Sequence, residues 1–161
     1  MRFWRKGRIL VKEMTSPIQT LPPTRAMRWV LTAAVVVPYL ISLGLPAVTG
    51  DIDEPNTTAL GLQALVMGIL VNPIAWLANM FLPIGLVLCH ADSFKGAAIA
   101  GAAAAACAAI PLVVPLGFAL ESGYYVWSSS MLVFLVGSFL CWHLRQRAEA
   151  ERELVSGSTP A

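Results

Sequence analysis

Charged residues are scarce in this chain of 161 residues, and their scarcity excludes most soluble architectures. Only 12% of the residues are charged, whereas 57% are hydrophobic. Soluble globular domains carry about 25% charged residues. Intrinsic disorder is excluded as well, because the uncharged stretches are rich in Leu, Val, Ile and Ala instead of polar residues. The composition therefore predicts an integral membrane protein.

Ionisable side chains are missing from the interior of every long apolar stretch. Proton-coupled carriers and pumps place such groups in the middle of the membrane, so these classes are excluded. The three cysteines include no Cys-x-x-Cys pair, which argues against a thiol oxidase. The run Ser128-Ser129-Ser130 has no activating base at the same membrane depth, so we interpret it as packing and local hydrogen bonding. These absences predict a non-enzymatic protein without catalytic residues.

Four uncharged stretches separate the islands of charge, and each exceeds the about 18 residues that suggest a membrane helix. We predict an all-α fold, a four-helix membrane bundle with helices at about 29–48, 59–89, 96–120 and 123–144. Residues 29–144 would form the transmembrane domain. Residues 1–28 would be a basic cytoplasmic tail, and residues 145–161 a charged cytoplasmic tail. We expect the fourth helix to continue past Leu144 into this second tail.

The orientation follows from the placement of basic residues. All 11 Lys and Arg residues lie in the N-terminal tail, the second loop and the C-terminal tail. Four spans put these three regions on one side, which the positive-inside rule identifies as the cytoplasm. The acidic residues Asp51, Asp53, Glu54 and Glu121 would then face outward. We predict a multi-pass plasma-membrane protein with both termini in the cytoplasm.

The second stretch has the most specific sequence. As one helix, the 31 residues of Ala59–Cys89 would be about 46 Å long, which exceeds the hydrocarbon core of about 30 Å. Asn72-Pro73 and Pro83 are the natural points at which to kink or break it. Six small or amide residues would share one helical face, which we expect to pack against the third and fourth spans. They are Gly61, Ala64, Gly68, Asn72, Ala75 and Asn79.

Three polar residues of this stretch, Asn72, Trp76 and Asn79, are the candidate site. The two amides need hydrogen-bond partners in hydrocarbon, so one hypothesis is bonding between helices. A protein of this kind would act through helix–helix or partner contacts, including self-association through small-residue faces, with the lipid bilayer around it. The alternative is a small channel or uncoupled carrier, with Asn72 and Asn79 lining its path.

Metal ligands are a further possibility that the spacing argues against. Cys89-His90 and Cys141-x-His143 end the second and fourth spans on the same side, and thiolate and imidazole bind zinc or copper. Neither spacing is typical of a metal site. Asp51, Asp53 and Glu54 are interpreted as a solvated acidic loop. We therefore predict no metal, no cofactor and no nucleic-acid partner.

Two short motifs add a resemblance. The second stretch contains Trp76-Leu77-Ala78-Asn79, and Gly123-Tyr124-Tyr125-Val126-Trp127-Ser128 opens the fourth. These motifs resemble a group of small bacterial inner-membrane proteins with four predicted helices, over the second to fourth spans. Proteins of that group have no assigned function. The resemblance thus implies a four-helix architecture in the bacterial inner membrane and no mechanism.

Overall fold

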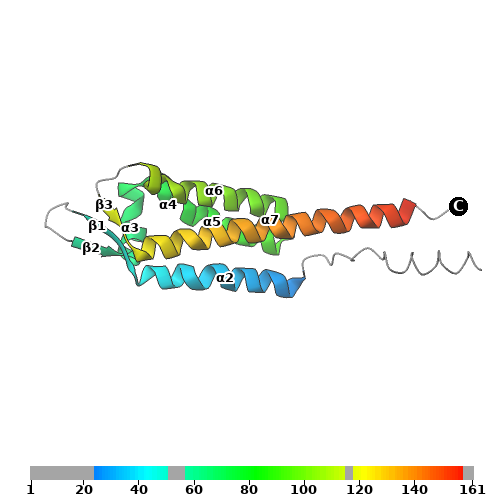
Figure 1. Cartoon of the computed structure of the whole chain (residues 1–161), viewed down its shortest axis with the longest axis horizontal. Coiled ribbons are helices and arrows are strands. Elements are labelled where there is room, and N and C mark those ends of the chain that lie inside the picture. The colour runs from blue at the N-terminus through cyan, green and yellow to red at the C-terminus, as the bar shows by residue number, and fades with distance from the viewer. Residues whose placement is uncertain (1–23, 51–56, 115–117, 158–161) are drawn as a thin grey trace, which may run out of the picture.

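The structure is a computed structural model that describes residues 24–50, 57–114 and 118–157, and it is mostly helical (Figure 1). Its helices are α2 (Arg25–Leu43), α3 (Gly61–Val71), α4 (Pro73–Trp76), α5 (Ala78–His90), α6 (Phe94–Val113) and α7 (Ser122–Gly157). Its strands are β1 (Pro46–Gly50), β2 (Thr57–Leu60) and β3 (Phe118–Leu120). Four helical stretches are long and apolar enough to cross a membrane: Arg25–Leu43, Pro73–His90, Phe94–Val113 and Ser122–Leu154. The four predicted apolar spans are therefore present.

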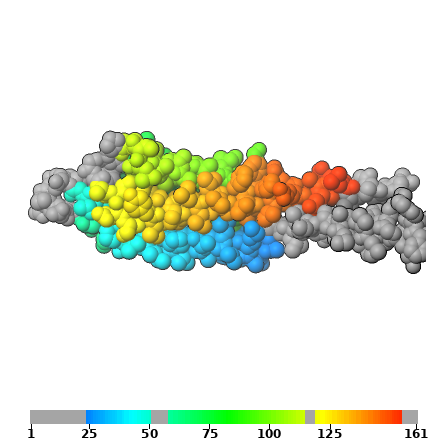
Figure 2. Space-filling model, in the orientation of Figure 1, coloured from blue at the N-terminus to red at the C-terminus, as the bar shows by residue number. Residues whose placement is uncertain are grey.

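The four long stretches lie side by side as a bundle. α6 packs against both α5 and α7, and α2 packs on the other side of α7. Figure 2 shows α7, in yellow to red, between α2 in blue and α6 in green. Phe134 of α7 is fully buried, and its ring fits against Gly85 of α5 and Gly101 of α6, where the missing Cβ atoms leave room for it. Large apolar side chains such as Val30, Leu70 and Val87 remain more than half exposed, as a lipid-facing surface requires.

A small antiparallel sheet closes one end of the bundle and was not predicted. β1 lies between β2 and β3, and Thr49 of β1 pairs with Thr58 on one side and Ala119 on the other. Residues 46–48, 59–60 and 118–120, expected in the first, second and third spans, thus belong to strands. The helices are shorter because proline disfavours helix on its N-terminal side: Leu45 precedes Pro46, and the extended Val114 precedes Pro115. We call this end of the molecule the sheet end.

The opposite end, which we call the charged end, differs from the predicted tails in one respect. α2 begins at Arg25, so Arg25 and Arg28 are helical; residues 1–23 lie outside the described part of the chain. The side chain of Thr24 caps this helix by accepting a hydrogen bond from the backbone N of Met27. α7 continues past Leu144 to Gly157 and extends beyond the bundle, as the sequence predicts (Figure 1).

Candidate binding pocket

The predicted break in the second stretch is present, and it turns the chain back on itself. Pro73 lacks a backbone N–H and disfavours helical geometry at Asn72, whose φ of −146° and ψ of 77° end α3. The Asn72 Oδ1 atom then accepts a hydrogen bond of 3.0 Å from the backbone N of Ala75, which caps α4. Trp76 Nε1 donates to the Leu65 carbonyl of α3 at 2.9 Å. Residues 61–76 therefore form a helical hairpin and not one membrane-spanning helix.

Asn79 connects three helices. Its Oδ1 atom accepts one hydrogen bond from Tyr39 Oη of α2, at 3.1 Å, and one from Trp127 Nε1 of α7, at 2.9 Å. This confirms that the Asn79 amide is hydrogen-bonded inside the bundle. Asn72, by contrast, bonds within its own segment. The sequence did not identify Tyr39 and Trp127 as the partners, although both lie on the polar or aromatic faces of their spans.

A pocket of about 420 Å³ opens at the sheet end, within the range of about 300–1,000 Å³ that ligand sites occupy. Its walls come from α3, α4, the sheet and the adjoining ends of α2, α5, α6 and α7. All three predicted site residues line it, together with Tyr39, Tyr124 and Trp127. Every lining residue in the described part of the chain is uncharged. The pocket is thus an apolar chamber with a few amide, hydroxyl and indole groups.

The small-residue face of the second stretch lines this pocket. Gly61 abuts the end of α2 at Ser42 and Leu43, and a Cβ on Gly68 would lie 3.2 Å from Trp76 Cδ1. The predicted packing of this face against the third and fourth spans is therefore wrong for Gly61 and Gly68. The break at Pro73 ends the helical phase that the prediction carried through it. All six residues of the face line the pocket, and Asn79 also meets the fourth span through its hydrogen bond with Trp127.

The region between the pocket and the charged end is closely packed. Val35, Met131 and Phe134 are fully buried there, and Leu82 is nearly so. The buried hydroxyls of Ser130 and Ser138 donate to carbonyls of their own helix, at Trp127 and Leu135. Ser128 and Ser129 do the same, which confirms the predicted local hydrogen bonding of the serine run. The pocket is therefore a chamber at one end of a packed bundle.

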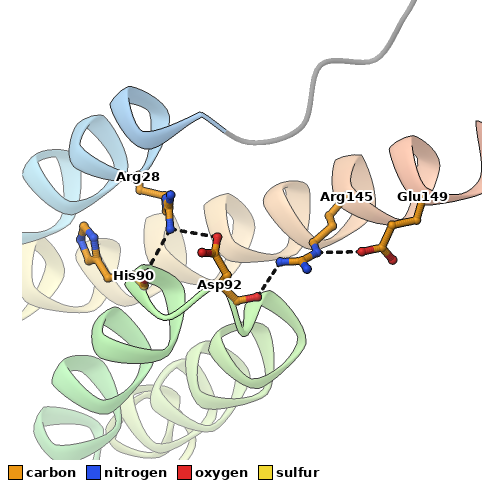
Figure 3. Close-up of polar contacts among 5 residues, drawn as sticks. All are labelled: Arg28, His90, Asp92, Arg145 and Glu149. Carbon is orange, nitrogen blue, oxygen red and sulfur yellow. Dashed lines mark hydrogen bonds and ion pairs between the residues drawn. The ribbon is translucent and has the colours of Figure 1, made fainter. Parts of the chain in front are cut away.

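The charged end is held by a polar cluster (Figure 3). The i,i+4 spacing of Arg145 and Glu149 predicts that one pair, and the sequence did not predict the rest. Arg28 of α2 donates to Asp92 Oδ1 at 2.9 Å and to the His90 carbonyl at 3.1 Å. Arg145 of α7 donates to the Asp92 carbonyl at 2.9 Å and pairs with Glu149 at 2.8 Å. Asp92 sits in the left-handed region, with φ of 60°. The α5–α6 turn is thereby tied to both neighbouring helices.

The candidate metal ligands contact other groups, are buried in the core, or lie outside the described residues. His90 Nε2 is 3.0 Å from Thr32 Oγ1, and its ring contacts Trp29 with centroids 4.8 Å apart. Cys89 and Cys141 are both buried in the apolar core. Within ranges 24–50, 57–114 and 118–157, no group of three or more His, Cys, Asp or Glu side chains is placed to hold a metal ion. The acidic residues 51, 53 and 54 lie outside those ranges.

Comparison of the chain with family models, with characterised proteins and with solved structures finds no match. The resemblance to small bacterial inner-membrane proteins therefore stays a prediction. What the chain does has to be argued from the sheet-end pocket itself.

Proposed function

We propose that the chain is a non-enzymatic multi-pass membrane protein that binds a small uncharged apolar molecule in the sheet-end pocket. The observation that carries this proposal is a chamber of about 420 Å³ whose described lining residues are all uncharged and mostly apolar. Small-molecule sites combine such a lining with a few placed polar groups, and Asn72 and Asn79 are of that kind. The lining offers these amides in place of the acid–base pairs that catalysis commonly uses.

We place the protein in the bacterial inner membrane, with both termini in the cytoplasm. The described basic residues all belong to the charged end or to α7 beyond it: Arg25, Arg28, Lys95, Arg145, Arg147 and Arg152. The positive-inside rule supports a cytoplasmic position for that end. The sheet end and its pocket then face outward, within reach of molecules dissolved in the outer leaflet.

Self-association through small-residue faces has less support than ligand binding. Gly85 and Gly101 accommodate the Phe134 ring, and a Cβ on Gly137 would collide with the side chain of Leu31. These three glycines are thus occupied within one chain, whereas Ala102, Ala106 and Ala109 of α6 are exposed. A second chain or a protein partner would have to use other surfaces.

A small channel or uncoupled carrier is the second candidate, because Asn72 and Asn79 do line a cavity. A path across the membrane would also have to pass the buried layer of Val35, Met131 and Phe134. That layer favours the binding protein over the channel. Proteoliposomes separate the two: a channel would release an entrapped small solute in a manner that Asn72→Leu abolishes, whereas the binding protein releases none.

Quenching of tryptophan fluorescence tests the binding proposal, because Trp76 and Trp127 line the pocket. A brominated alkane, titrated into protein in alkyl maltoside detergent, should quench part of the emission in a saturable manner. Gly68→Leu should abolish the saturable part, since its side chain would grow against Trp76 and fill the chamber. Leu70→Ala is the matched control, because Leu70 is 77% exposed on the other face of α3. Quenching that never saturates, or that is equal in Gly68→Leu, would exclude the pocket as a binding site.

A further inference from the structure

The side-chain amides around the pocket share one arrangement. Asn72 Oδ1 accepts from the backbone N of Ala75, and Asn79 Oδ1 accepts from Tyr39 and Trp127. Gln63, which also lines the pocket, uses its Oε1 atom to accept from the backbone N of Leu60 at 2.9 Å. Each oxygen is therefore occupied by a donor of the protein itself.

The partners fix which way the amides point. A backbone N–H and an indole N–H can only donate, so the atom facing each of them must be the amide oxygen. The NH₂ groups of Gln63, Asn72 and Asn79 consequently point away from these partners. Within the described part of the chain, no group accepts a hydrogen bond from any of the three.

The pocket therefore has a surplus of donors. Its two indoles are already committed, Trp76 to Leu65 and Trp127 to Asn79, and the Tyr39 hydroxyl donates to Asn79. Among the described residues, the NH₂ groups of the half-buried Asn72 and Asn79 are left without a protein acceptor beside an apolar chamber, whereas Gln63 is exposed. An amide in such surroundings gains from any acceptor that a guest supplies.

The absence of charge in the described lining restricts the class of molecule that can bind. A carboxylate or phosphate would also accept hydrogen bonds, but among residues 24–50, 57–114 and 118–157 the lining holds no cation to compensate its charge. Burial of an unpaired anion in apolar surroundings is strongly unfavourable. A plain hydrocarbon would fill the chamber but leave the donors unused. The best complement is an uncharged molecule with an apolar body and an acceptor oxygen that carries no hydrogen.

We propose that the pocket selects neutral lipid-like molecules that bear a carbonyl group, such as a ketone, an ester or a quinone. The carbonyl oxygen would accept from the NH₂ groups of Asn72 and Asn79, while the apolar part packs against Trp76 and the wall of α3. This inference rests on the proposed function, because it specifies the guest of the same pocket.

Competition between matched probes tests the selectivity. A long-chain ketone and the alkane of equal length are each used to displace the brominated alkane, in an alkyl maltoside detergent that contains no carbonyl. A net hydrogen bond contributes on the order of 1 kcal/mol, a factor of roughly five in affinity. We therefore expect the ketone to bind at least about fivefold more tightly than the alkane.

Two variants test whether the side-chain amides cause the preference for the ketone over the alkane. Asn79→Leu should reduce the ketone-to-alkane ratio toward one while the alkane still binds, which shows that the pocket is intact. If Asn79→Leu fails to fold, Asn72→Ser replaces it. A serine hydroxyl can still cap α4, while the side chain loses the amide NH₂ and keeps a single, shorter O–H donor. A ratio that is halved or lower in Asn72→Ser supports the inference.

The outcomes separate the inference from the proposed function. If neither probe displaces the brominated alkane, the proposed function is wrong and the inference falls with it. If the ketone and the alkane bind the unmodified protein equally well, the pocket exists but the carbonyl selectivity is wrong. A ketone preference that persists undiminished in both variants would also overturn it, because the amides could not be its source.

Discussion

Replacing Gly85 with valine should lower the stability of the bundle by roughly 1–3 kcal/mol, the usual cost of overpacking a filled core. A Cβ at this position would lie 2.7 Å from Phe134 Cζ and 3.2 Å from the Cβ of Ala100. Phe134 is fully buried and cannot move its ring aside. Thermal unfolding in detergent, followed by the loss of helical circular dichroism, measures the effect.

A double-mutant cycle shows whether Phe134 is the cause. Phe134→Leu alone should destabilise the core, because it leaves a cavity. Combined with Gly85→Val, it should restore part of the lost stability, since the valine would occupy the vacated space. Strictly additive effects of the two substitutions would mean that Gly85 does not face Phe134.

Gly61→Ala should have the second large effect, because this glycine joins α3 to the end of α2. Its Cβ would overlap the Ser42 carbonyl oxygen and lie 2.9 Å from Leu43 Cα. Both obstacles are backbone atoms, so α3 must shift, at an overpacking cost of roughly 1–3 kcal/mol. We expect a lower melting temperature and the loss of saturable quenching by the brominated alkane.

Gly44→Ala is the matched control for Gly61→Ala. Gly44 lies one residue past the end of α2, with φ of −92°, a backbone conformation open to alanine. A Cβ there would lie 3.7 Å from the Ile41 carbonyl oxygen, an ordinary contact. The free energy of unfolding of Gly44→Ala should stay within about 0.5 kcal/mol of that of the unmodified protein. Equal tolerance of both substitutions would show that α3 does not dock on α2 at Gly61.

Much of the helical architecture was predictable because a bilayer imposes simple rules on a chain. Apolar stretches must be long enough to cross it, and their backbone groups must be bonded internally. The break at Asn72-Pro73 followed from the missing N–H of proline. The sheet was not predictable, because its short strands continue the apolar stretches and their pairing, as between Thr49 and Ala119, joins distant parts of the chain.

The candidate site was predictable in its members and not in its geometry. Asn72, Trp76 and Asn79 stood out as polar groups in an apolar stretch, and all three line the pocket. The partners of Asn79 could not be identified, because hydropathy does not tell which face of α2 or α7 meets α5. The predicted packing of Gly68 against the third and fourth spans was wrong, because the prediction treated the residues on both sides of Pro73 as one continuous helix. The pairing of Arg28 with Asp92 depends in the same way on helix packing.

Native mass spectrometry of the protein, released from a mild detergent after purification from its membrane, tests the central claim most directly. We expect one neutral lipid-like molecule to stay bound to a fraction of the chains, and the Gly68→Leu variant to carry none because its pocket is filled. Leu70→Ala should retain the same molecule as the unmodified protein. A bare chain in every preparation, or an adduct of equal abundance in Gly68→Leu, would contradict a ligand-binding pocket at the sheet end.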